Sequence, residues 1–151
     1  IQFGDYIWTA MMQIRNEMAT LRYRSNGQWS CPMEIRVPVG GYIHGSLCHS
    51  QSIDGYFTHL PGIKIAYPSN AEDAKGLLKA ACRMNNPVLF FEHKALYRSL
   101  RQEVPNDYYN IPIGKASVLR SGDSISVISY GAAIHYAMKV LDNNDQIEPI
   151  V

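Results

Sequence analysis

No stretch of the sequence approaches the run of about 20 apolar residues that a membrane-spanning helix needs. No block of like charge is present either, because the 14 basic and 13 acidic residues are spread along the chain and leave a formal net charge of +1. Nucleic acids and acidic membrane surfaces attract clustered positive charge. We therefore expect neither a nucleic acid nor a membrane as a partner.

Cysteine is also scarce, with three examples at Cys31, Cys48 and Cys82. An odd number without close pairing argues against a disulfide scaffold and is typical of a reducing compartment. The glycines form neither a dinucleotide-binding nor a P-loop pattern. The chain starts without an initiator methionine or a signal peptide and ends on apolar residues. We therefore expect a piece of a longer polypeptide.

Apolar residues make up 46% of the chain, which is enough for a folded core. Near the start, apolar side chains recur at spacings of three and four, which predicts an amphipathic helix over residues 5–22. The stripe consists of Ile7, Met11, Ile14, Met18 and Leu21. Asp5 is the expected N-cap of this helix.

Three short apolar segments predict β-strands over residues 34–39, 63–67 and 88–91. The first contains Pro38, which marks the end of a strand or the edge of a sheet. The third is almost wholly apolar, as expected in the middle of a parallel sheet. Because such strands alternate with helices, the sequence predicts a doubly wound α/β fold with a mostly parallel sheet.

Two further helices are expected between these strands. Residues 53–59 predict a short one. Ser69 and Glu72 form a capping box, which predicts the start of a longer helix over residues 71–84. The predicted buried face of this helix consists of Ala74, Leu77, Leu78, Ala81 and Cys82.

The pattern divides the chain into two units. Residues 1–93 form the first unit, which we expect to lack its N-terminal part, and residues 94–110 form a charged, proline-containing linker. Residues 111–151 form the start of a second, truncated α/β unit. In that unit the sequence predicts strands over 115–119 and 125–130 and a helix over 132–141.

The segment 40–51 has no period and is rich in glycine, histidine and small polar residues, which is typical of a functional loop. Histidine and cysteine are common metal ligands, but the spacing of His44, Cys48 and His49 is not that of a known zinc motif. The adjacency of Cys48 and His49 also argues against a thiolate–imidazole pair. From the residues alone, catalytic histidines and histidines that only bond the loop backbone both stay open.

Three other positions have a functional and a structural interpretation. Tyr6 is either a core aromatic or a site residue. Glu92 and His93 end the apolar strand over 88–91, and α/β sites gather at the carboxyl ends of parallel strands. The commoner explanation for these two residues is exposed charge at a strand end.

Taken together and in order, several segments resemble one family. They are residues 1–6 (Ile-Gln-Phe-Gly-Asp-Tyr), 23–27 (Tyr-Arg-Ser-Asn-Gly), 35–38 (Ile-Arg-Val-Pro), 44–52 (His-Gly-Ser-Leu-Cys-His-Ser-Gln-Ser), 61–64 (Pro-Gly-Ile-Lys), 74–78 (Ala-Lys-Gly-Leu-Leu) and 86–87 (Asn-Pro). The chain resembles the transketolase-like pyrimidine-binding domain in the β subunit of pyruvate and branched-chain 2-oxo acid dehydrogenases. The His-Ser-Gln loop and the Pro-Gly-Ile-Lys segment are the specific parts of this likeness.

The resemblance implies an enzyme that decarboxylates a 2-oxo acid on thiamine diphosphate and passes the acyl group to a lipoyl arm. The pyrimidine-binding domain holds the aminopyrimidine ring, whereas the α part binds the diphosphate through Mg²⁺. The implied partners are an α subunit or α half, another β copy and a lipoyl-bearing acyltransferase core. The implied compartment is the cytoplasm, or the mitochondrial matrix in a eukaryote.

Three residues match functional positions of the family. Tyr6 matches an aromatic residue that stacks on the aminopyrimidine ring, and Gln2 matches a glutamine in the same pocket. His49 matches the histidine that supplies a proton during acyl transfer, for which an imidazole is suited because its pKa lies near operating pH. Some members also hold a structural K⁺ ion near Cys31 and residues 82–86, but both stretches are shorter here, which argues against a metal site.

The resemblance also implies that parts are missing. The glutamate that activates the cofactor precedes the Ile-Gln-Phe segment in the family, and the motif that binds Mg²⁺ and diphosphate is not in this sequence. We therefore expect the 151 residues alone to be inactive. Two alternatives stay open, namely another thiamine diphosphate enzyme of the transketolase or deoxyxylulose phosphate synthase type, and a non-catalytic assembly module.

Overall fold

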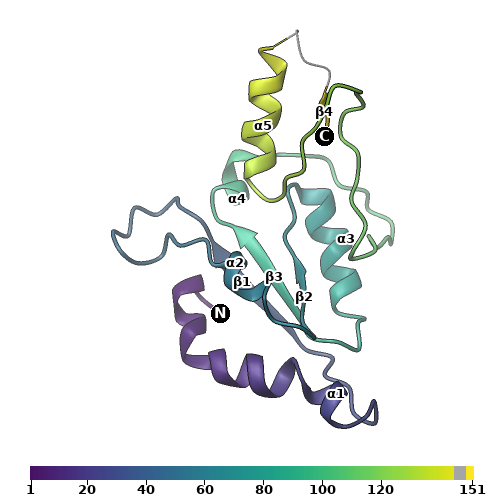
Figure 1. Cartoon of the computed structure of the whole chain (residues 1–151). Coiled ribbons are helices and arrows are strands. Elements are labelled where there is room, and N and C mark those ends of the chain that lie inside the picture. Colours follow the sequence, from purple (N-terminus) through teal and green to yellow (C-terminus); the bar gives the residue numbers. More distant parts are fainter. Residues whose placement is uncertain (145–148) are drawn as a thin grey trace.

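The structure is a computed structural model that describes residues 1–144 and 149–151 (Figure 1). Its centre is a parallel three-stranded sheet in the order β1 (Glu34–Val39), β3 (Val88–His93), β2 (Lys64–Ala66). The predicted strands, their parallel direction and the central place of the third strand are confirmed. In this sheet β1 is an edge strand, which explains why it accommodates Pro38.

Helices cover both faces of the sheet, as the doubly wound class requires (Figure 1). On one face, Ile7 and Ile14 of the N-terminal helical segment pack on Val37, Leu89 and Phe91. On the other face, α3 (Ala71–Ala81) contributes the second core cluster. That cluster consists of Ala66, Ala81, Val88 and Phe90, with Leu77, Leu78, Met84 and Ile113 packed against it.

The N-terminal segment is helical as predicted, but its winding changes along its length. A 3-10 helix, η1 (Gly4–Ala10), is followed by a π-helix, η2 (Gln13–Met18), and by α1 (Leu21–Arg24). The predicted N-cap is wrong, because Phe3 holds the N-cap position and no side chain caps the helix. The carboxylate of Asp5 instead accepts the backbone N–H of His49, far along the sequence.

The long helix α3 starts at Ala71, as predicted, but its N-cap is a different residue from the one predicted. Its N-cap is Asn70 rather than Ser69, and the Asn70 side chain accepts the Asp73 N–H at 2.8 Å. The helix ends at Ala81 rather than at residue 84, which leaves Cys82 exposed instead of buried. The Cys82 thiol donates a hydrogen bond to Glu34 on the edge strand.

The region predicted as a linker, residues 94–110, contains the short helix α4 (Leu96–Ser99) and then runs without regular structure. It continues alongside α3, where Tyr109 donates its hydroxyl hydrogen to the Glu72 carbonyl and the Ile111 N–H donates to the Gly76 carbonyl. The predicted helix over 53–59 is present as α2 (Asp54–Phe57).

The C-terminal part matches its prediction less well. Helix α5 (Ala133–Asp142) is confirmed, but the strand over 125–130 shortens to β4 (Ile125–Ser126) and the strand over 115–119 does not form. A strand needs a ladder partner, and in the described residues β4 pairs only with β5 (Pro149–Ile150). Within 1–144 and 149–151, no helix is long and apolar enough to cross a membrane.

Candidate functional site

The loop 40–51 leaves the carboxyl end of β1, beside the carboxyl end of β3, and projects from the body of the molecule (Figure 1). Its two ends meet where the Gly40 N–H donates to the Gln51 carbonyl at 2.9 Å. Gly40 is required at this point, since its φ is +79° and a Cβ there would lie 2.1 Å from Nε2 of His93. The sheet therefore presents the loop at the edge where α/β proteins bind ligands.

His49 is packed between the loop and the start of the N-terminal helical segment. Its ring lies 4.0 Å from the Phe3 ring and 5.7 Å from the Tyr6 ring, centroid to centroid, and is perpendicular to the Tyr6 ring. Its backbone N–H donates to Oδ2 of Asp5 at 2.6 Å. Its Nδ1 is buried and has no hydrogen-bond partner among the described residues. The imidazole is thus packed against two aromatic rings, and its buried Nδ1 is left without a hydrogen bond in the described part of the chain, which is uncommon for a buried polar atom.

Tyr6 is not a core residue, because 48% of it is exposed at the site. One face of an amphipathic ring is therefore available for stacking. Gln2 is also exposed, and its side-chain amide makes no hydrogen bond within the described part of the chain. The structure brings Tyr6 and His49 into contact, whereas no hydrogen bond among the described residues joins the Gln2 side chain to either of them.

Lys94 lies at the same edge of the sheet, just after β3. It is only 5% exposed, and its ammonium lies 5.8 Å from the centroid of the Phe3 ring. Burial lowers the pKa of Lys94, and the negative charge of Asp5 opposes that effect. The pKa of the neighbouring His93 is also lowered, first by burial and then by the Lys94 charge.

Sequence reasoning missed Phe3 and Lys94 as site residues and gave Asp5 a different role. Lys94 lies in the predicted linker, and Phe3 belongs to the family-like segment 1–6 without having been given a role of its own. The one available signal was the position of Lys94 directly after an apolar strand, since the carboxyl ends of parallel strands are where sites gather. The contact between Asp5 and His49 joins residues 44 positions apart, so no local pattern predicts it.

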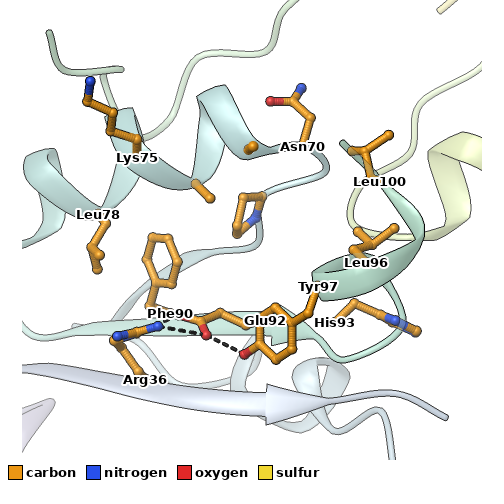
Figure 2. A pocket seen from close by; sticks show the side chains of 13 residues that line it. Arg36, Asn70, Lys75, Leu78, Phe90, Glu92, His93, Leu96, Tyr97 and Leu100 are labelled. Carbon is orange, nitrogen blue, oxygen red and sulfur yellow. Dashed lines mark hydrogen bonds and ion pairs between the residues drawn. The ribbon is translucent and has the colours of Figure 1, made fainter. Parts of the chain in front are cut away.

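A second polar cluster lies on the α3 face of the sheet (Figure 2). Glu92 is buried and accepts two hydrogen bonds from Arg36, at 2.5 and 2.9 Å, and a third from the Tyr97 hydroxyl. The expectation of exposed charge at this strand end is therefore wrong for Glu92. Burial raises the pKa of Tyr97, and the hydrogen bond to Glu92 raises it further. The cluster forms one wall of a mainly apolar pocket of about 360 Å³.

The described residues contain no group of three or more histidine, cysteine or acidic side chains placed to hold a metal ion. His44 is exposed, and within the described residues neither its ring nor that of His49 bonds the loop backbone. The stretch near Cys31 and residues 82–86, which correspond to the K⁺ site of some family members, lie together, because the Cys31 N–H donates to the Asn85 carbonyl at 3.2 Å. That contact is a direct backbone hydrogen bond.

Comparison with known proteins agrees with this architecture. Residues 1–99 match the family described as the pyrimidine binding domain of transketolase, and the chain belongs to that family. A solved split-gene transketolase, described as an inactive beta4 tetramer, superposes with a TM-score of 0.72 over 99% of this chain and 46% of its own, at 21% sequence identity. That likeness shows the fold.

Several curated proteins have a much higher sequence identity to this chain than this solved structure has. The chain is 54% identical to the 2-oxoisovalerate dehydrogenase subunit beta of Bacillus subtilis over 94% of its own length and 43% of the relative. It is 47% identical to the pyruvate dehydrogenase E1 component subunit beta of the same organism, again over 94% of this chain and 44% of the relative. A mitochondrial 2-oxoisovalerate dehydrogenase subunit beta from Dictyostelium discoideum is also 47% identical, over 94% of this chain and 39% of the relative. The chain therefore spans less than half the length of these relatives.

Proposed function

We propose that this chain is part of the β subunit, or β half, of a thiamine-diphosphate-dependent 2-oxo acid dehydrogenase. The family to which it belongs is one of thiamine-diphosphate-dependent enzymes. The observation that carries the proposal is the packing of the His49 ring against Phe3 and Tyr6 at the carboxyl edge of a parallel sheet. Because the chain covers under half of its relatives, the activity belongs to the complete polypeptide with its partners.

The residues at this site suit the aminopyrimidine end of the cofactor. Tyr6 offers a half-exposed ring for stacking on a flat heteroaromatic ring. Gln2, in the extended segment before η1, has a free amide that can hydrogen-bond the polar edge of that ring. When bound, thiamine diphosphate supplies the carbon centre on which a 2-oxo acid loses CO₂.

His49 is the catalytic residue in this proposal. Transfer of the acyl group to a lipoyl disulfide forms a carbon–sulfur bond and breaks the sulfur–sulfur bond, which leaves a thiolate that needs a proton. A protonated imidazole can donate that proton and become neutral, and a positioned general acid contributes about 10²–10⁴-fold to a rate. The proposal is supported by the partial exposure of His49 and by the absence of a hydrogen-bond partner of its Nδ1 among the described residues.

The remaining assignments concern the complete assembly. The Mg²⁺ ion and the diphosphate are bound by the α part in this proposal, as the resemblance implies. Residues 1–93 form the pyrimidine-binding unit, 94–110 the linker and 111–151 the start of the C-terminal unit. Another β copy and a lipoyl-bearing acyltransferase core complete the set of partners. The compartment is the cytoplasm, or the mitochondrial matrix if the source is a eukaryote.

The proposal is tested by expressing the complete polypeptide with its α partner and following reduction of an artificial electron acceptor. Pyruvate and 2-oxoisovalerate are compared, each with and without thiamine diphosphate and Mg²⁺. We expect turnover that depends on the cofactor, and the preferred acid identifies the substrate. Cofactor binding without turnover of either acid would indicate another thiamine diphosphate chemistry. A folded assembly that binds no cofactor would instead favour the assembly-module interpretation.

A further inference from the structure

The loop that carries His49 has an unfavourable backbone conformation. Three of its non-glycine residues, His44, Ser46 and His49, have φ angles of +58°, +59° and +64°. Such angles cost free energy in residues with a Cβ and persist only where surrounding contacts impose them. The position of the imidazole therefore depends on the contacts that hold this loop.

Few contacts hold it in the described part of the chain. The Gly40–Gln51 backbone bond closes the base of the loop, and the Cys48 N–H donates to the Gly45 carbonyl within it. The hydrogen bond from the His49 N–H to Oδ2 of Asp5, at 2.6 Å, is the one that ties the catalytic residue itself to a rigid element. Asp5 lies in η1, directly before Tyr6.

The surroundings of the Asp5 carboxylate indicate that its role is to accept the His49 N–H. Its second oxygen, Oδ1, is buried and has no hydrogen-bond partner among the described residues, which is costly for a carboxylate. Burial lowers the pKa of the nearly buried Lys94, and the opposite charge of Asp5 partly offsets that effect. The Lys94 ammonium also faces Phe3, whose ring packs on His49.

We propose that Asp5 is the positioning residue of His49, and that it fixes the imidazole relative to Tyr6 by accepting the His49 N–H. This inference rests on the proposed function, because it assigns a partner to the catalytic histidine of that proposal. Lys94 supports the arrangement from the end of β3. Through Asp5, the start of η1 thus couples Tyr6, which faces the cofactor in the proposed function, to His49, which serves acyl transfer.

The test uses the complete β polypeptide assembled with its α partner, and measures the single-turnover rate of acyl transfer to a lipoyl domain. We expect Asp5→Ala to slow this step by about 10-fold or more, since a small misplacement of a catalytic group costs up to about 10² in rate. Asp5→Asn retains an oxygen that can accept the His49 N–H, so most of the rate should be rescued. The affinity for thiamine diphosphate should be unchanged in both variants.

Two comparisons separate positioning from a general loss of structure. In a His49→Ala background, Asp5→Ala should cause no additional loss, because a residue that acts through His49 has nothing left to position. The matched control is Asp54→Ala, which removes another half-buried carboxylate from the first turn of a short helix, α2. It should leave the acyl-transfer rate near that of the wild type.

The outcomes distinguish this inference from the proposed function. Wild-type acyl transfer in His49→Ala would reject the role of the histidine and, with it, the proposed function of the site. A slow His49→Ala variant beside an unaffected Asp5→Ala variant, or losses that multiply in the double variant, would overturn only the role of Asp5. If Asp5→Ala does not fold, Asp5→Glu answers the same question, because it keeps the charge but moves the oxygens by one methylene. It should also slow acyl transfer, and an unchanged rate would overturn the inference.

Discussion

Arg24 and Arg36 have side chains of equal exposure, 58%, yet they bind carboxylates in different environments. The partner of Arg24 is Glu17, whose side chain is 63% exposed, and the partner of Arg36 is Glu92, whose side chain is 9% exposed. An ion pair in water contributes little to stability, whereas a buried carboxylate that loses its partner is costly. The burial of the carboxylate, and not the presence of an ion pair, therefore determines how much each arginine matters.

We expect Arg36→Ala to lower the free energy of unfolding by about 1–3 kcal/mol, because among the described residues Glu92 would keep only the Tyr97 hydroxyl as a hydrogen-bond partner. Arg24→Ala is the matched control and should change it by less than about 1 kcal/mol. Urea unfolding of the chain at constant pH measures both values. Equal effects of the two substitutions would show that Glu92 does not depend on Arg36.

His93 makes stability depend on pH. Its pKa is lowered in the folded chain by burial and by Lys94, while in the unfolded chain it lies near the ordinary value of about 6.5. Between those two pKa values the unfolded chain binds a proton that the folded chain does not. Stability should therefore fall as the pH is lowered through about 6.5 and continue to fall until the folded pKa is reached.

Unfolding midpoints in urea at about pH 7.5 and pH 5.5 measure this dependence, since the interval includes the ordinary histidine pKa. His93→Gln should reduce the loss of stability at the lower pH. His59→Gln, at an exposed position after α2, serves as the control. A His93→Gln variant that loses as much stability on acidification as the unsubstituted chain would contradict this account.

At the scale of the elements, the start of α3 shows how two adjacent residues divide a role. Asn70 accepts the Asp73 N–H and also donates to the Asp73 carboxylate, whereas the Ser69 side chain makes no capping bond. Ser69 instead takes part through its backbone carbonyl, which lies 2.6 Å from Nε2 of His135 in α5. The capping box predicted from Ser69 and Glu72 placed the N-cap one residue too early, because Asn and Ser are both good N-caps, although the predicted helix start at Ala71 is confirmed.

Asn70→Ala should therefore destabilise the chain by about 1 kcal/mol, the usual cost of removing an N-cap side chain. Ser69→Ala keeps the backbone carbonyl and should change stability by less than about 0.5 kcal/mol. Thermal unfolding of the two variants under one condition is sufficient for the comparison. The cap assignment would be wrong if Ser69→Ala were the more damaging change.

Prediction from sequence succeeded where the signal is local and apolar. The strand at 34–39 is indicated by alternating apolar residues, and the central strand at 88–93 by an apolar run that can be buried only inside a covered parallel sheet. It failed for residues 115–119, where Val118 and Leu119 suggest a strand but are more than half exposed. Strand formation there depends on a partner that local patterning cannot supply.

The same limit applies to the site. His49 and Tyr6 were identified because short segments resemble a family, and the structure brings those two rings together. Asp5 and Lys94 reach the site only through the tertiary fold, because one contacts a distant backbone N–H and the other follows a buried strand. Periodicity instead suggested a helix cap for Asp5 and a linker for Lys94.

At the scale of the whole molecule, the two parts of the chain are connected by specific contacts near the loop. The Tyr130 hydroxyl donates to Asp54 at 2.8 Å, and the Tyr130 ring lies 5.4 Å from that of Tyr67. This proximity of Asp54 raises the pKa of Tyr130. The C-terminal part therefore lies against α2, the element that directly follows the His49 loop.

The central claim is that His49 carries acyl-transfer chemistry in this fold. The most direct test is the rate of reductive acylation of a lipoyl domain by the complete, cofactor-loaded assembly, with His49→Ala compared with His44→Ala. Both histidines lie in the same loop with positive φ, but only His49 contacts Phe3 and Tyr6. We predict a loss of about 100-fold or more for His49→Ala, with cofactor binding retained, and a rate near wild type for His44→Ala. Equal rates for the two variants would contradict the account.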